Sequence, residues 1–82
     1  MAAITLEPNT YTQLNTNSSS YMIQNIGSDN VSIVVSDTQP TDDEVGFVIG
    51  PREGITNSHI EGILWGKPEG KYHITVVVAE GS

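Results

Sequence analysis

Apolar and polar residues alternate along two segments of the chain. In the first, residues 31–36, apolar side chains occupy every second position: Val31, Ile33 and Val35. The second, residues 72–79, carries four apolar residues on one face: Tyr72, Ile74, Val76 and Val78. A period of two is typical of strands that bury one face. We therefore expect these rows to form the core, with 72–79 in the middle of a sheet and Ser32 on the less buried face. The alternative is that both faces of 31–36 are covered, since the apolar Val34 faces the same way as Ser32.

Glycine, proline and small polar residues divide the rest of the chain into further short strands. The strands predicted from apolar content are 4–6, 11–14, 21–26, 47–49, 55–58 and 63–65. Segments 21–26 and 31–36 are expected to pair as a hairpin across Gly27–Asn30. We expect 47–49 to be buried and 66–70 to be a turn.

The sequence shows no helical period, so the pattern predicts an all-β fold, either a small β-sandwich or a jelly-roll-like barrel of short antiparallel strands. The chain has 82 residues, enough for a single domain over 1–82. Pro8 cannot donate to a central ladder. Residues 1–8 are therefore expected to form an N-terminal arm. The acidic segment 37–45 is expected to lead from one sheet to the other or across an end of the domain.

Charge and cysteine content narrow the classes of partner. Three basic against ten acidic side chains give a formal net charge of −7, which disfavours binding to nucleic acid or to an anionic membrane. With no cysteine, the domain has no disulfide to stabilise it, and self-association is a common alternative for a chain this small. The first eight residues, MAAITLEP, lack the features of a signal peptide, so we expect synthesis in a cytoplasm.

Few residues offer catalytic chemistry. His59 and His73 are the two histidines, and neither lies in a motif that activates a nucleophile. The carboxylates of segment 37–44 match no calcium-binding loop, and a solvated connection is the favoured interpretation. We therefore predict no enzymatic activity, no cofactor and no metal. Trp65 is expected to lie in the core or at a subunit interface, with ligand binding as the alternative.

The region 21–55 resembles small virion proteins of tailed phages. The resemblance rests on an aromatic-led strand with the sequence QNIG at 24–27, on VSIVVS at 31–36, on SDTQPTDD at 36–43, and on a glycine followed by FVIGPREGI at 47–55. It covers a little under half of the chain. In this pattern a glycine is expected after Pro51, where the chain has Arg52.

The resemblance implies a phage virion structural protein, a capsid decoration or cementing protein that binds the major capsid protein or another virion protein. It also implies a homo-oligomer, with a trimer expected first, and a location on the virion. An arm can add a strand to a neighbour's sheet. The residues expected to bind a partner are Ala3, Ile4, Thr5, Leu6 and Trp65. The alternative is a receptor- or carbohydrate-binding module of a tail or head fibre, which clustered, exposed aromatic residues would favour.

Overall fold

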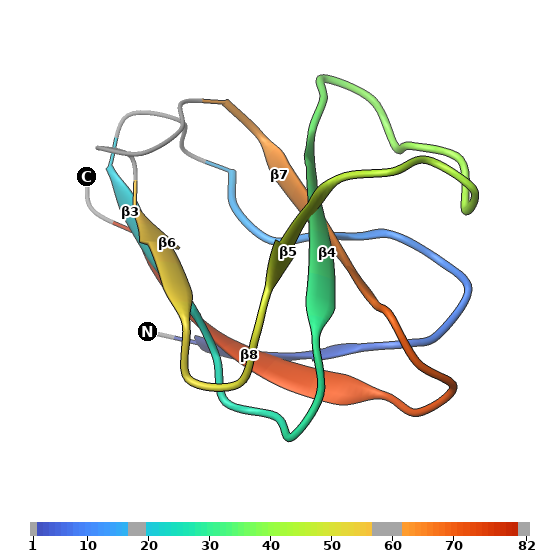
Figure 1. Ribbon diagram of the computed structural model, residues 1–82. Coiled ribbons are helices and arrows are strands. Elements are labelled where there is room, and N and C mark those ends of the chain that lie inside the picture. The colour runs from blue at the N-terminus through green and yellow to red at the C-terminus, as the bar shows by residue number, and fades with distance from the viewer. Residues whose placement is uncertain (1, 17–19, 57–61, 81–82) are drawn as a thin grey trace.

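Two four-stranded antiparallel sheets face each other in the computed structural model, which describes residues 2–16, 20–56 and 62–80 (Figure 1). Sheet A has the order β1-β8-β3-β6, and its strands are β1 (Ala2–Leu6), β8 (Ile74–Glu80), β3 (Tyr21–Asn25) and β6 (Gly54–Thr56). Sheet B has the order β2-β7-β4-β5, and its strands are β2 (Thr12–Gln13), β7 (Leu64–Pro68), β4 (Val31–Val35) and β5 (Phe47–Ile49). The predicted all-β sandwich is confirmed.

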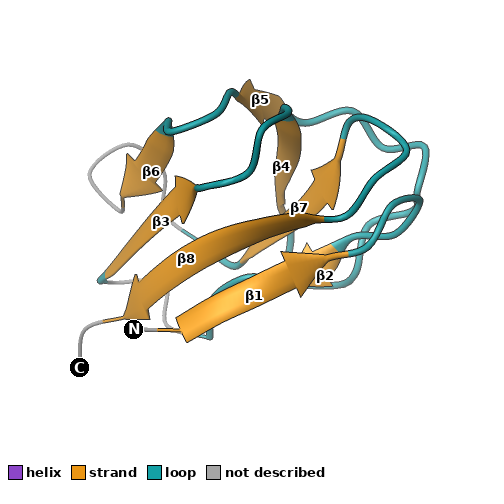
Figure 2. Ribbon diagram, turned by 90° about the horizontal axis from the view of Figure 1, so that it is seen from below, coloured by secondary structure: helices purple, strands orange, loops and turns teal. Residues whose placement is uncertain are grey.

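The core lies between the sheets and contains most of both predicted rows. Val31 and Ile33 of β4 are buried, as are three residues of β8: Ile74, Val76 and Val78. Strand β8 lies between β1 and β3, as predicted for the middle of a sheet (Figure 2). Val35 and Tyr72, however, are exposed. Val35 is the last residue of β4, and Tyr72 precedes β8, so each lies at or beyond an end of its strand.

The predicted hairpin between 21–26 and 31–36 is wrong, because β3 belongs to sheet A and β4 to sheet B. Each strand has apolar residues at every second position, and both apolar rows are buried because the two strands face each other from opposite sheets. The buried side chain of Asn25 folds the connection: its Oδ1 accepts from the Gly27 N–H at 2.9 Å, and its Nδ2 donates to the Asp29 carbonyl at 2.8 Å. These bonds direct the chain across to the other sheet.

Of the two courses expected for the acidic connection, the crossing from one sheet to the other is wrong. The connection joins β4 to β5, which are neighbours in sheet B, and does not cross to sheet A. In Figure 1 it is the long green loop beside β4. It lies against residues that precede β2, since Gln39 Nε2 donates to the Tyr11 carbonyl at 2.9 Å and the Tyr11 hydroxyl donates to the Glu44 carbonyl at 2.6 Å. The connection therefore covers part of the outer face of sheet B.

The turn predicted at 66–70 is wrong for its first three residues, because β7 continues through Pro68 and the chain bends only from Glu69. Gly66 lies inside this strand, opposite Thr12 and Ile33. A Cβ on Gly66 would come within 3.0 Å of Leu6 Cδ1 and 3.1 Å of Leu14 Cδ1. Gly66 thus makes room for core leucines and does not form a turn.

The N-terminal segment is part of the domain. Strand β1 pairs with β8 along its whole length, from Ala2 opposite Val78 to Leu6 opposite Ile74. Leu6 is completely buried in the core. The expected arm over 1–8 is therefore a paired edge strand, although its end before Pro8 is as predicted.

Candidate partner-binding surfaces

The most apolar exposed surface lies along β5, the outermost strand of sheet B. The sequence predicted a buried strand at 47–49, but Phe47 is 60% exposed and Val48 is 52% exposed, and Ile49 alone is buried. β5 pairs with β4 on one side and ends the strand order on the other. Its free side presents unpaired backbone groups, which is the arrangement that favours addition of a further strand.

Exposed valines before β5 extend this surface, which we call the β5 edge patch. Its members are Val35, Val45, Phe47 and Val48. Val45, at 92% exposed, is the most accessible of them. A hollow of about 440 Å³ lies beside the strand and is lined by Val34 and by three members of the patch: Val35, Val45 and Phe47. A surface with clustered large apolar side chains and a hollow is typical of a protein-binding site.

Gly46 lets the chain enter β5 close to β4. A Cβ at this position would lie 2.1 Å from the carbonyl oxygen of Ile33 and 2.7 Å from Val34 Cγ2. A backbone carbonyl cannot move aside as the end of a flexible side chain can. The absence of a side chain at Gly46 therefore determines how the β5 edge patch is presented.

Carboxylates flank the patch on its N-terminal side. Asp42, Asp43 and Glu44 are all exposed. A hydrogen bond of 2.6 Å from Thr41 Oγ1 to Asp43 Oδ1 holds the pKa of Asp43 below its usual value. The Lys67 ammonium donates to the backbone carbonyl of Asp42 and lies 5.1 Å from the centre of the Tyr11 ring. The N-terminal side of the β5 edge patch thus carries three carboxylates beside one lysine ammonium group.

The outer face of sheet A has a different character. On its three longest strands, β1, β3 and β8, the outward-facing residues are Ala3, Thr5, Met22, Gln24, Thr75, Val77 and Ala79. These side chains are all uncharged, in a chain with a net charge of −7. Met22 is 59% exposed and Ile26, just after β3, is 49% exposed. We refer to this surface as the neutral face.

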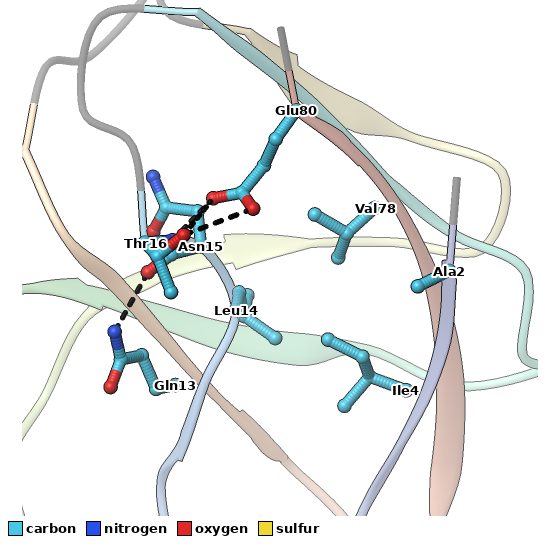
Figure 3. Close-up of a pocket in the computed structure, with 8 residues that line it drawn as sticks. All are labelled: Ala2, Ile4, Gln13, Leu14, Asn15, Thr16, Val78 and Glu80. Atoms are coloured by element: carbon cyan, nitrogen blue, oxygen red, sulfur yellow. Dashed lines mark hydrogen bonds between the residues drawn. The ribbon is translucent and has the colours of Figure 1, made fainter. Parts of the chain in front are cut away.

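A groove of about 530 Å³ opens between β1 and β2 (Figure 3). Ile4, Leu14 and Val78 form its apolar part. Toward the other end, the Glu80 carboxylate accepts hydrogen bonds from the N–H and the Oγ1 of Thr16. These bonds connect the end of β8 to the residues after β2.

The residues predicted to bind a partner lie on several different surfaces. Ala3 and Thr5 are exposed on the neutral face, whereas Ile4 points to the groove between β1 and β2 (Figure 3). The side chain of Leu6 is in the core, so it cannot contact a partner in this fold. Trp65 is half-buried on the outer face of sheet B, where its Nε1 donates to the Ser36 carbonyl at 2.9 Å.

The β5 edge patch was missed by the sequence interpretation. The run Phe47–Ile49 is wholly apolar, and an apolar run without alternation is ordinarily a sign of burial on both faces. Its exposure follows from its place at the end of sheet B. The one local signal was Val45, an apolar residue that directly follows three acidic residues.

In the part of the chain that the structure describes, the titratable side chains do not cluster into a catalytic or metal-binding arrangement. His73 is exposed before β8, and His59 lies outside the described residues. Within 2–16, 20–56 and 62–80, histidine, aspartate and glutamate form no cluster of three or more that could hold a metal ion. The expectation that the protein has neither catalytic activity nor a cofactor stays a prediction.

Comparison with known proteins identified no relative: no family model, no curated protein and no solved structure matches the chain. Among the described residues there is no helix with the length and apolar character needed to span a membrane. The function is therefore argued from the residues and surfaces above.

Proposed function

We propose that this chain is a structural protein of a tailed-phage virion, and that it decorates or cements the capsid by binding assembled shell subunits. The resemblance of 21–55 to small virion proteins motivates the proposal. The observation that supports it most is the grouping of exposed apolar side chains along one free strand edge, because such a surface is suited to contact with another protein.

Under this proposal the protein has no enzymatic activity and no cofactor, and it binds neither nucleic acid nor membranes. The net charge of −7 opposes binding to packaged genome and to anionic lipid. It also limits aggregation of free copies in the host cytoplasm before they reach the virion. A decoration protein must remain soluble until the shell has assembled.

We also propose that the protein self-associates, with a trimer as the first expected state, and that the neutral face carries this contact. Two copies with a charge of −7 each repel one another wherever their carboxylates meet. The outward side chains of β1, β3 and β8 bring no charge to such a contact. Met22 and Ile26 supply its largest exposed apolar side chains.

A receptor- or carbohydrate-binding module is the second candidate, and the positions of the aromatic residues weigh against it. Tyr11 and Tyr21 are buried, and Trp65 is half-buried with its indole N–H already bonded to a carbonyl. Tyr72 is exposed by itself in the turn before β8. Stacking on a sugar needs an accessible aromatic face, and these residues do not form a shared exposed platform.

Purified particles test the proposed function. We expect the chain to co-purify with them in a fixed ratio to the major shell protein, measured by quantitative mass spectrometry. A stoichiometry of one copy per shell subunit, or a simple fraction of it, supports a shell component. A few copies per particle would support the tail or fibre alternative, and absence from particles would contradict both.

A further inference from the structure

We propose that the β5 edge is a strand-addition site, and that its occupant is an extended segment of another protein with alternating apolar side chains and flanking lysine or arginine residues. This inference rests on the proposed function only for the source of the segment, a shell subunit. The sequence predicted partner binding at the N-terminal strand and at Trp65. The structure points to a different edge of the sandwich.

The backbone of β5 is free on the side away from β4. The strand pairs with β4 through three opposed residue pairs, from Val31 opposite Ile49 to Ile33 opposite Phe47. Its C-terminal end is already occupied, because the Ile49 carbonyl accepts from Asn25 Nδ2 at 3.4 Å and the Gly50 N–H donates to the Glu53 carboxylate. The accessible part of the edge therefore lies at Phe47 and Val48, with Val45 just before the strand.

The side chains around this edge can bind alternate residues of an added strand. Phe47 and Val48 point to opposite faces of sheet B and are both more than half exposed. The hollow of about 440 Å³ lies beside Val45 and Phe47. In strand addition, main-chain hydrogen bonds supply affinity and side-chain hollows supply specificity. The β5 edge offers both.

Charge selects the kind of segment. Asp42, Asp43 and Glu44 are exposed immediately before the edge, and the Thr41 hydrogen bond lowers the pKa of Asp43, so that this carboxyl keeps its charge to a lower pH than an unperturbed aspartate. Basic residues flanking the segment would meet these carboxylates, and complementary charge raises the rate of encounter and fixes orientation. A second copy of this chain would instead bring its own acidic residues and a net charge of −7.

A yeast-displayed library of random linear peptides tests the site on the isolated protein. We expect selection to enrich sequences with alternating apolar residues, lysine or arginine flanks and no proline. Phe47→Asp should weaken the binding of the enriched peptides at least about tenfold, because it removes an apolar contact. The new carboxylate does not repel the basic flanks, so the loss reports on the apolar contact. Tyr72→Asp is the control: Tyr72 is also an exposed aromatic residue, at 80%, and belongs neither to this edge nor to the neutral face. It should leave peptide affinity unchanged.

Val48→Asp, at a position that is 52% exposed, serves as a second variant, and Tyr72→Asp is its control as well. Circular dichroism verifies that each variant is folded. The proposal is overturned if no such peptides are enriched, or if their affinity for the Phe47 and Val48 variants equals that for the parent. It is also overturned if the parent self-associates through this edge, which would appear in sedimentation velocity as oligomers lost in Phe47→Asp. Peptide binding by a protein that is absent from particles would contradict the virion role and leave the strand-addition site supported.

Discussion

The hydroxyl of Tyr11 lies 3.0 Å from the hydroxyl of Ser32, on the outer face of sheet B. The Tyr11 hydroxyl donates to the Glu44 carbonyl, so its oxygen is free to accept from Ser32. Both side chains are buried, although neither belongs to the core between the sheets. The connection between β4 and β5 thus gives β4 a second covered face, with consequences for stability.

Ser32→Asp should destabilise the domain by about 2 kcal/mol or more, because it buries a carboxylate beside the Tyr11 hydroxyl. Lys67, opposite Ser32 on β7, already donates to the Asp42 carbonyl and offsets only part of this cost. The sequence alone suggested a mild effect at this position. Thr5→Asp on the exposed neutral face is the control and should cost less than about 1 kcal/mol. Urea unfolding followed by tryptophan fluorescence measures both. Equal midpoints for the two variants would show that the connection does not cover Ser32.

Gly46→Ala should lower the free energy of unfolding by about 2 kcal/mol or more, because its Cβ would overlap the Ile33 carbonyl, 2.1 Å away. Gly70→Ala is a suitable control. The nearest atom to its Cβ, at 2.7 Å, is an oxygen of the Asp29 side chain, which can rotate away. The thermal unfolding midpoints of the two variants should therefore differ clearly. A small effect at Gly46 would mean that β5 is not held against β4 as described.

Arg52→Gly should leave stability unchanged or raise it by up to about 1 kcal/mol. Arg52 has a φ of 71°, a left-handed conformation that costs a side-chain-bearing residue about 1 kcal/mol or more and that glycine adopts freely. The greater freedom of glycine in the unfolded chain offsets part of this gain. Glycine retains both hydrogen bonds of the Arg52 backbone. The N–H donates to the Asn25 carbonyl, and the carbonyl accepts from Gln24 Nε2.

The matched control for this turn is Lys71→Gly, which removes the same charge from another exposed loop position and should destabilise by about 0.5 kcal/mol. Differential scanning calorimetry gives both values. A loss at position 52 as large as that at 71 would indicate that Arg52 does not occupy the left-handed region.

Deletion of residues 2–6 should unfold the domain or lower its midpoint severely. The deletion removes the completely buried Leu6 and exposes the edge of β8. The view of this segment as an arm predicted a modest effect. Ala3→Asp, at an exposed position of the same strand, should leave the midpoint almost unchanged. A truncated protein with the parent's midpoint would restore the arm interpretation.

Met22→Asp should reduce self-association, because it introduces a carboxylate into the neutral face where two acidic copies are proposed to meet. Sedimentation velocity at micromolar concentration should show oligomers for the parent and mainly monomers for the variant. Phe47→Asp, at the other surface, should retain the oligomers. A monomeric parent would contradict self-association in solution.

The presence of short strands could be read from the sequence because alternation is a local property. Val31 and Ile33, or Ile74, Val76 and Val78, show their common face through spacing alone, and this spacing was sufficient for the all-β class. The residue after Pro51 also carried information: a glycine was expected there, and Arg52 adopts a conformation that favours glycine.

Strand pairing and the covering of faces were decided by tertiary structure. The turn residues Gly27–Asn30 are compatible with a hairpin, yet the chain crosses between sheets there because both edges of β3 are taken by β8 and β6. Gly66 resembled a turn residue, but its function is to leave space for Leu6 and Leu14, which are distant in sequence. The exposure of Phe47 and Val48 depends on the final place of β5 in sheet B. These outcomes arise from contacts between residues far apart along the chain, and local spacing carries no information about them.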